Sequence, residues 1–148
     1  MADATAHLAP AARFGADIPV TLSSSSVFPL GTQDVFATAE DLGYDGVEVM
    51  VTHNAWSQDA RRLTRLSERH GMPIDSIHAP TLLFTQQVWG SAWSKIRRSV
   101  ELAQAVGAAT VVAHPPFRWQ RAYARGFAAQ VARLEDTHGI VVAVENLY

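Results

Sequence analysis

One pattern recurs four times along the chain and limits what the chain can fold into. Each time, a glycine ends an amphipathic segment, an apolar β-strand-like run follows, and a polar side chain stands at or near its end. This alternation of helix-like and strand-like segments indicates the α/β class, with a parallel sheet and right-handed crossovers. The glycines are Gly43, Gly71, Gly107 and Gly139, and the polar residues are Glu48, His78, His114 and Glu145.

The spacing of this pattern favours one α/β architecture. Successive polar residues are 30, 36 and 31 positions apart, and a (β/α)8 TIM barrel of roughly 250 residues uses about 31 residues per unit. The 148 residues therefore predict a partial TIM barrel with five parallel strands and four intervening helices, in which strands six to eight are missing. An open doubly wound sheet is the alternative. Residues 23–31, after the first strand, lack the glycine-rich phosphate loop typical of that fold.

The pattern also predicts where the elements lie. Residues 1–17 are rich in alanine, and we expect them to form a flexible tail before a single partial-barrel domain, residues 18–148. We expect strands at residues 19–23, 46–51, 74–78, 110–113 and 140–145, and helices at residues 32–42, 60–70, 94–106 and 121–136.

Composition excludes several classes of protein. The chain has no cysteine, which excludes disulfides, thiolate metal sites and a cysteine nucleophile. The net charge of −2 argues against a dedicated nucleic-acid binder, which normally carries a basic excess. No run of residues is long and apolar enough to span a membrane, and the N-terminus lacks the features of a signal peptide. We therefore expect a cytoplasmic protein with no membrane partner.

The polar residues at the strand ends predict a site. The carboxyl ends of barrel strands share one face, and that face carries the active site. Glu48, His78, His114 and Glu145 should therefore converge there, and such a set suits a divalent ion such as Zn²⁺, Mn²⁺ or Co²⁺. The simpler alternatives are that each histidine is a hydrogen-bonded loop residue and that Glu48 is paired within the barrel.

Aromatic residues gather in the loops that follow the third and fourth expected strands. Trp89 and Trp119 are candidates to hold a sugar ring, although they can also pack against the barrel rim. Glu48 and Asn146 are candidates for polar contacts with the same substrate.

Four sequence motifs carry a family resemblance. They are LGYDGVEV around Glu48, IHAP around His78, SVELAQAVGAATVVAHPP around His114, and VAVENLY around Glu145. In this order the chain resembles the xylose-isomerase-like TIM-barrel superfamily. That group holds sugar (phosphate) isomerases and epimerases, and also the endonuclease IV-type apurinic (AP) endonucleases. The resemblance covers nearly all of the chain from the first expected strand onward.

The resemblance implies roles for three residues. It makes Glu145 a ligand of a divalent metal (Zn, Mn, Co or Mg) and, in epimerase-like members, one of two acid/base groups. It makes His78 and His114 zinc ligands in endonuclease-like members, whereas the equivalent positions of sugar-acting members can face substrate. Further ligands come from strands six to eight, which this sequence does not contain.

The expected function is that of a metal-dependent sugar or sugar-phosphate isomerase or epimerase, which transfers a proton beside a carbonyl. Its partner would be a small sugar or sugar phosphate and not a nucleic acid. One alternative is an endonuclease IV-like zinc-dependent AP endonuclease, against which the negative net charge counts. Another is a non-catalytic truncated fragment that self-associates, as a homo-oligomer, through exposed strand edges.

Overall fold

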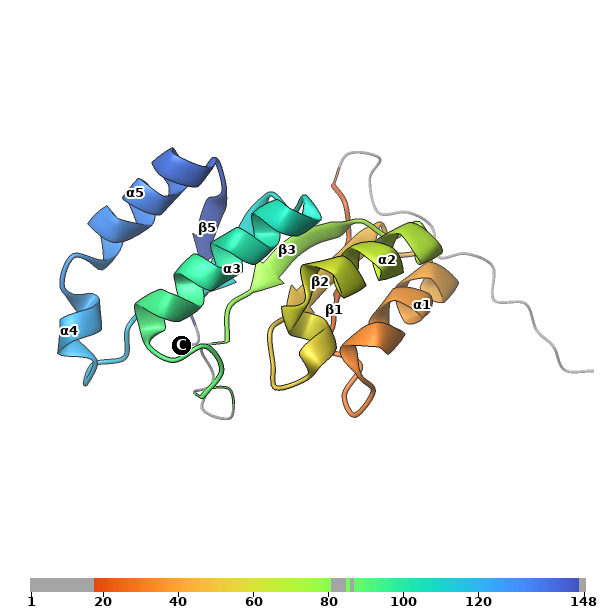
Figure 1. Ribbon diagram of the computed structural model, residues 1–148, viewed down its shortest axis with the longest axis horizontal. Coiled ribbons are helices and arrows are strands. Elements are labelled where there is room, and N and C mark those ends of the chain that lie inside the picture. The colour runs from red at the N-terminus through yellow and green to blue at the C-terminus, as the bar shows by residue number, and fades with distance from the viewer. Residues whose placement is uncertain (1–17, 81–84, 86, 147–148) are drawn as a thin grey trace, which may run out of the picture.

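A five-stranded parallel sheet forms the centre of the protein (Figure 1). The computed structural model describes residues 18–80, 85 and 87–146. The strands follow one another in sequence order without a reversal. A doubly wound sheet has a point where the strand order reverses, so the α/β partial barrel is confirmed. The strands are β1 (Thr21–Ser23), β2 (Gly46–Met50), β3 (Ile74–His78), β4 (Thr110–Ala113) and β5 (Val141–Val144).

Four longer helices lie side by side over one face of this sheet, in front of it in Figure 1. Each of them ends at the glycine that the sequence predicts, and each glycine adopts the left-handed conformation, with φ between 62° and 77°. A glycine has no Cβ and reaches this conformation at little cost. These helices are α1 (Thr32–Leu42), α2 (Ala60–His70), α3 (Ala92–Val106) and α5 (Phe127–His138); the shorter η1 (Ala55–Gln58) and α4 (Arg121–Ala124) lie between them.

The expected single helix over residues 121–136 is wrong. The chain forms α4 and α5 instead, because Gly126 has a φ of 71° and interrupts the helix between them. Tyr123, Phe127 and Val131 are spaced four residues apart, which made the segment look continuous. The other elements differ from expectation only at their ends. The predicted tail, residues 1–17, lies outside the described residues.

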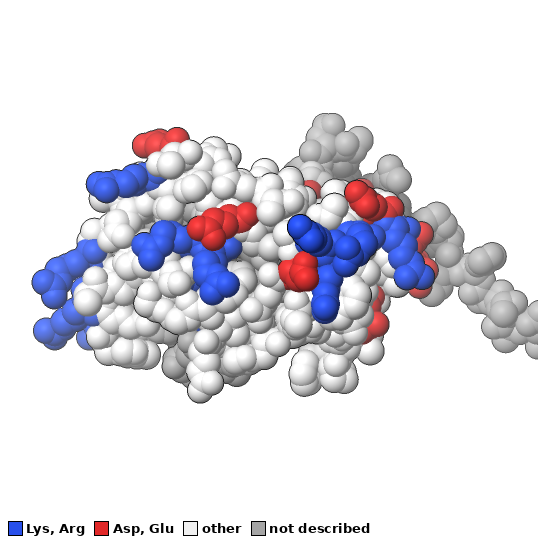
Figure 2. Space-filling model, viewed as in Figure 1, with Lys and Arg blue, Asp and Glu red and all other residues white. Residues whose placement is uncertain are grey.

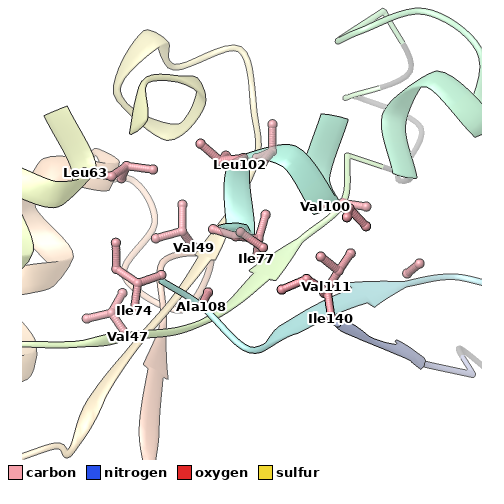
Figure 3. Packing of buried hydrophobic residues seen from close by; sticks show 14 of the residues in the cluster. Val47, Val49, Leu63, Ile74, Ile77, Val100, Leu102, Ala108, Val111 and Ile140 are labelled. Carbon is pink, nitrogen blue, oxygen red and sulfur yellow. The ribbon is translucent and has the colours of Figure 1, made fainter. Parts of the chain in front are cut away.

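The core lies between the sheet and the helical layer. Figure 3 shows strand residues such as Val49, Ile77 and Val111 pointing toward Leu63 of α2 and Val100 of α3. All five are 0% exposed, and burying one such side chain stabilises the fold by about 1.5–3 kcal/mol. No helix of the described ranges is long and apolar enough to cross a lipid bilayer.

The opposite face of the sheet carries a polar row. Successive residues of a strand point to opposite faces, and Val47 and Val49 point to the helices, so Glu48 points away from them. Ser23 and Ser76 are the register partners of Glu48 on β1 and β3. The inner face of the partial barrel is therefore polar beside the carboxyl ends of its strands.

Candidate functional site

Two histidines and one glutamate meet at the carboxyl ends of neighbouring strands. His78 is the last residue of β3, while His114 and Glu145 directly follow β4 and β5. Nε2 of His78 lies 3.2 Å from Nε2 of His114 and 3.5 Å from Oε2 of Glu145. One ligand atom from each of the three residues lies within 4.8 Å of the others. The structure thus brings together the three residues that the sequence proposes as metal ligands, here called the His-His-Glu cluster.

The second ring nitrogen of each histidine faces an oxygen that accepts hydrogen bonds. Nδ1 of His78 lies 3.3 Å from Oε1 of Glu48, and Nδ1 of His114 lies 3.1 Å from the backbone oxygen of Glu145. A carbonyl or carboxylate oxygen accepts hydrogen bonds, so these partners favour the tautomer in which each neutral ring carries its proton on Nδ1. The lone pairs of both Nε2 atoms then face each other.

Those facing lone pairs fit a cation. Two lone pairs 3.2 Å apart repel each other unless a positive charge lies between them. Two nitrogens bound to a tetrahedral zinc at 2.0–2.1 Å are separated by about 3.4 Å. His78 and His114 are 6% and 3% exposed, whereas the side chain of Glu145 is 51% exposed. The donor set therefore suits a divalent ion with one side open to a ligand.

Glu48 lies beside the cluster rather than within it. It stands in the middle of β2, and its carboxylate accepts hydrogen bonds from the hydroxyls of Ser23 (2.8 Å) and Ser76 (3.1 Å) as well as from His78. Burial acts to raise the pKa of Glu48, but the hydrogen bonds of His78, Ser23 and Ser76, together with the electrostatic attraction of the His78 ring, outweigh it and lower the pKa. Glu48 is therefore a carboxylate at neutral pH that holds the His78 ring.

Comparison with known proteins identifies the family. The family model described as xylose isomerase-like TIM barrel matches residues 36–148. The chain belongs to this family. The matched range includes the whole His-His-Glu cluster, and the resemblance that the four motifs predict is confirmed.

Several curated proteins are similar to this xylose isomerase-like chain. The uncharacterized proteins Mb0509 of Mycobacterium bovis and Rv0498 of Mycobacterium tuberculosis are each 52% identical to it over 132 residues. The protein ML2432 of Mycobacterium leprae is 51% identical over the same length. Each alignment covers 88% of this chain and 47% of the relative. The chain thus spans about half the length of these relatives.

A solved structure shares the fold. The crystal structure of an AP endonuclease, family 2, from Brucella melitensis matches with a TM-score of 0.62 and 20% identity, over 86% of this chain and 55% of that one. At this identity the likeness shows the fold alone. It matches the five-stranded sheet and its helices to a part of a TIM barrel.

The residues that the sequence proposes for substrate binding differ in their contacts and in how exposed they are. Nε1 of Trp89 donates a hydrogen bond to Gln58 (3.0 Å), and the guanidinium of Arg98 lies 5.0 Å from the centre of the Trp89 ring. Trp119 is 73% exposed and stacks on Phe117, with ring centroids 4.8 Å apart. Trp119 therefore presents an open aromatic surface, whereas Trp89 is tied to η1 and α3. Asn146 follows Glu145 and is exposed.

Sequence reasoning missed four polar residues near the cluster. Ser23 and Ser76 hold Glu48, and their signal is the strand register, which is set by pairing between distant segments. Lys95 and Tyr123 line a pocket that also includes His114. Lys95 is the only lysine among the 148 residues. This feature is visible in the composition and could have drawn attention to the residue.

Charge over the helical layer is mixed. Figure 2 shows this face, where basic and acidic side chains are interspersed over the helices. A surface that binds nucleic acid through its phosphates normally gathers Lys and Arg on one face. Over α2 and α3 the helical face shows no such separation of charge, whereas basic side chains alone are seen at its left edge, beside α4 (Figure 2).

Proposed function

We propose that the His-His-Glu cluster binds a divalent metal ion, in an enzyme that isomerises or epimerises a sugar or sugar phosphate. The observation that carries this proposal is the 3.2 Å separation of the two Nε2 atoms, with both Nδ1 atoms facing acceptors. Membership of the xylose isomerase-like TIM-barrel family supports the substrate class. The position of the cluster at the strand ends supports it too, because barrel enzymes place their chemistry there.

The donor atoms of the cluster narrow the choice of metal ion. His78 and His114 each offer an imidazole nitrogen, and Glu145 offers a carboxylate oxygen. Imidazole suits Zn²⁺ and related transition-metal ions better than it suits Mg²⁺ or Mn²⁺, which prefer oxygen ligands. A bound divalent ion would polarise the carbonyl and hydroxyl oxygens of a sugar and so stabilise negative charge on them.

The protein's own residues would divide the remaining work. Glu145 is half-exposed beside the buried histidines, so its carboxylate can reach a substrate and transfer a proton at the carbon next to the carbonyl. Glu48 would orient His78 through Nδ1, as carboxylates commonly do for metal-binding histidines. Trp119 offers an exposed ring against which the sugar can pack.

Hydrogen exchange into a panel of sugars tests this proposal while the substrate is still unidentified. The protein expressed from its complete coding sequence is incubated in D₂O with aldoses, ketoses and their phosphates, and deuterium at the carbon beside the carbonyl is followed by NMR. We expect deuterium in at least one substrate, and its loss in Glu145→Gln and after treatment with a chelator. Exchange that persists in Glu145→Gln would contradict the role of Glu145.

A zinc-dependent AP endonuclease is the second candidate, because the buried pair of imidazole nitrogens also suits zinc. The net charge of −2 counts against it, since phosphate contacts dominate affinity for DNA. The same purified protein is offered a duplex that contains one abasic site, at low salt and with zinc. Cleavage of this duplex, without any deuterium exchange in the sugars, would favour the endonuclease over the isomerase.

A further inference from the structure

A pocket of about 320 Å³ opens beside the His-His-Glu cluster. Three parts of the chain surround it: the start of α3, the loop that follows β4, and the helix α4. His114 forms part of its wall. This volume is at the lower end of the range for small-molecule sites. Lys95 and Tyr123, two polar residues of this wall, have no role in the function proposed above.

Lys95 is the first unusual residue of this wall. It is 5% exposed, and Nζ donates a hydrogen bond to the backbone oxygen of Thr85 at 3.3 Å. Within the described residues it forms no ion pair. Burial lowers the pKa of Lys95, because an ammonium group out of water is unstable without a counter-charge. The eleven other residues that carry a full positive charge at neutral pH are all arginines, and the chain's single lysine is the one buried in this wall.

Tyr123 is the second unusual residue of this wall. Its side chain is 8% exposed, and its hydroxyl is buried without a hydrogen-bond partner among the described residues. The ring is held edge-on by Trp93 and Phe127, at centroid distances of 5.0 Å and 5.3 Å. Burial raises the pKa of Tyr123 to about 12, so the hydroxyl keeps its proton at neutral pH. A buried donor without a partner is costly, and a ligand that accepts its hydrogen bond would remove that cost.

The rest of the wall includes two aromatic rings that are held in place by their own contacts. Phe117 and Trp119 stack with their ring planes 3° apart, and the backbone N–H of Phe117 donates to the side chain of Gln120 at 2.9 Å. Besides His114 and Gln120, the pocket thus combines one ammonium, one hydroxyl donor and an apolar surface. Within the described part of the chain, the ammonium lacks a counter-charge and the hydroxyl lacks a hydrogen-bond acceptor, and an anionic ligand would supply both.

We propose that this pocket is an anion subsite, in which Lys95 and Tyr123 bind the phosphate or carboxylate of a substrate whose other end lies at His114. The inference rests on the proposed function and narrows its substrate class to sugars that carry an acidic group. It predicts that a neutral sugar binds less well than the same sugar with a phosphate.

Calorimetric titration of the metal-free protein, expressed from its complete coding sequence, separates this inference from the metal site. The probes are inorganic phosphate, acetate and ribose, each at about 0.15 M NaCl, where exposed charges are largely screened. We expect phosphate to bind, and its affinity to fall about 10-fold or more in Lys95→Met and several-fold in Tyr123→Phe, which removes one hydroxyl only. Arg97→Met, an exposed change on the same helix, should leave the affinity within about twofold.

Each outcome decides the inference. Binding of acetate but not phosphate, with the same dependence on Lys95, would support the subsite and assign it to a carboxylate. Binding of neither anion, binding of ribose as tight as that of phosphate, or equal phosphate affinity in Lys95→Met and the unchanged protein, would overturn it. Melting curves identify variants that fail to fold, and Tyr123→Phe retains the ring if Lys95→Met does not fold. If metal binding fails while phosphate still binds, the proposed function fails and the subsite stands.

Discussion

Oε1 of Glu48 lies 3.3 Å from Nδ1 of His78, so the ring of His78 is held by a carboxylate on one side and presents Nε2 to His114 on the other. Three strands make this arrangement: β2 supplies Glu48, β3 supplies His78, and β1 and β3 supply the serines that fix Glu48. The cluster is therefore tied to the regular hydrogen-bonding pattern of the sheet and not to loops alone.

Replacing Glu48 should weaken metal binding. Glu48→Ala removes the acceptor for Nδ1 of His78, and we expect the affinity for zinc to fall about 10- to 100-fold, as for other partners of metal-binding histidines. Glu48→Gln keeps an oxygen acceptor and should lose less. Zinc affinity is measured by competition with a chromogenic chelator, with Glu101→Ala, an exposed change on α3, as the control. Equal affinities in all variants would show that Glu48 does not orient His78.

Asp75 should make stability depend on pH. Its Oδ2 is buried without a hydrogen-bond partner among the described residues, and burial, together with the charge of Asp45, raises its pKa above the usual 3.8. The folded state therefore binds this proton more tightly than the unfolded state. The stabilisation that Asp75 contributes is present below pH 3.8 and is lost as the pH rises through the raised pKa.

Asp75→Asn should thus increase the free energy of unfolding at neutral pH, and the increase should vanish at a pH below the usual aspartate pKa of 3.8. Urea unfolding at several pH values measures this difference. Asp136→Asn, an exposed change on α5, should show no comparable trend. A gain for Asp75→Asn that is the same at both ends of this pH range would contradict this account of Asp75.

Gly126 should resist substitution. It holds a φ of 71° at the break between α4 and α5, where a residue with a Cβ is strained. Gly126→Ala should therefore lower the free energy of unfolding by about 1 kcal/mol, and Gly126→Asn by less, because asparagine tolerates this conformation better. Thermal or denaturant melts give the comparison. A greater loss for Asn than for Ala would indicate that space, not backbone conformation, limits this position.

A protein of these 148 residues alone should self-associate. The strands β1 and β5 each pair with one neighbour among the described strands, and Val141 and Val144 of β5 are 56% and 49% exposed. Unpaired strand edges invite pairing with another chain, and a charge on the edge discourages it. We expect light scattering to report dimers or larger species, and Val141→Lys to shift the population toward monomer. A stable monomer with a cooperative melt would refute this expectation.

The sequence predicts the repeating units well because each unit contains its own signals, a glycine that ends the helix and a polar residue that ends the strand. Gly43, Gly71, Gly107 and Gly139 end their helices as expected, and His78, His114 and Glu145 meet as expected, since the ends of parallel strands share one edge. Local signals of this kind do not depend on distant contacts.

What the sequence does not show depends on contacts between distant segments. The register of β2 and β3 shifts between Val47 and Glu48, which pairs Glu48 with Ser76 instead of Asp75. A one-residue change of register reverses which face a side chain occupies, so the hydrogen bonds of Glu48 were not predictable. The pocket of Lys95 and Tyr123 likewise forms only when α3 and α4 lie beside the loop after β4.

Titration with Co²⁺ tests directly whether the His-His-Glu cluster binds a metal ion. Co²⁺ is titrated into the protein expressed from its complete coding sequence, and its visible absorption reports ligands, number of sites and affinity. We expect one site per chain whose affinity falls at least about 10-fold in His78→Ala, His114→Ala and Glu145→Gln, and remains unchanged in His70→Ala, whose ring pairs with Glu40 on the helical layer. Unchanged cobalt affinity in the His78→Ala/His114→Ala double variant would contradict the metal site.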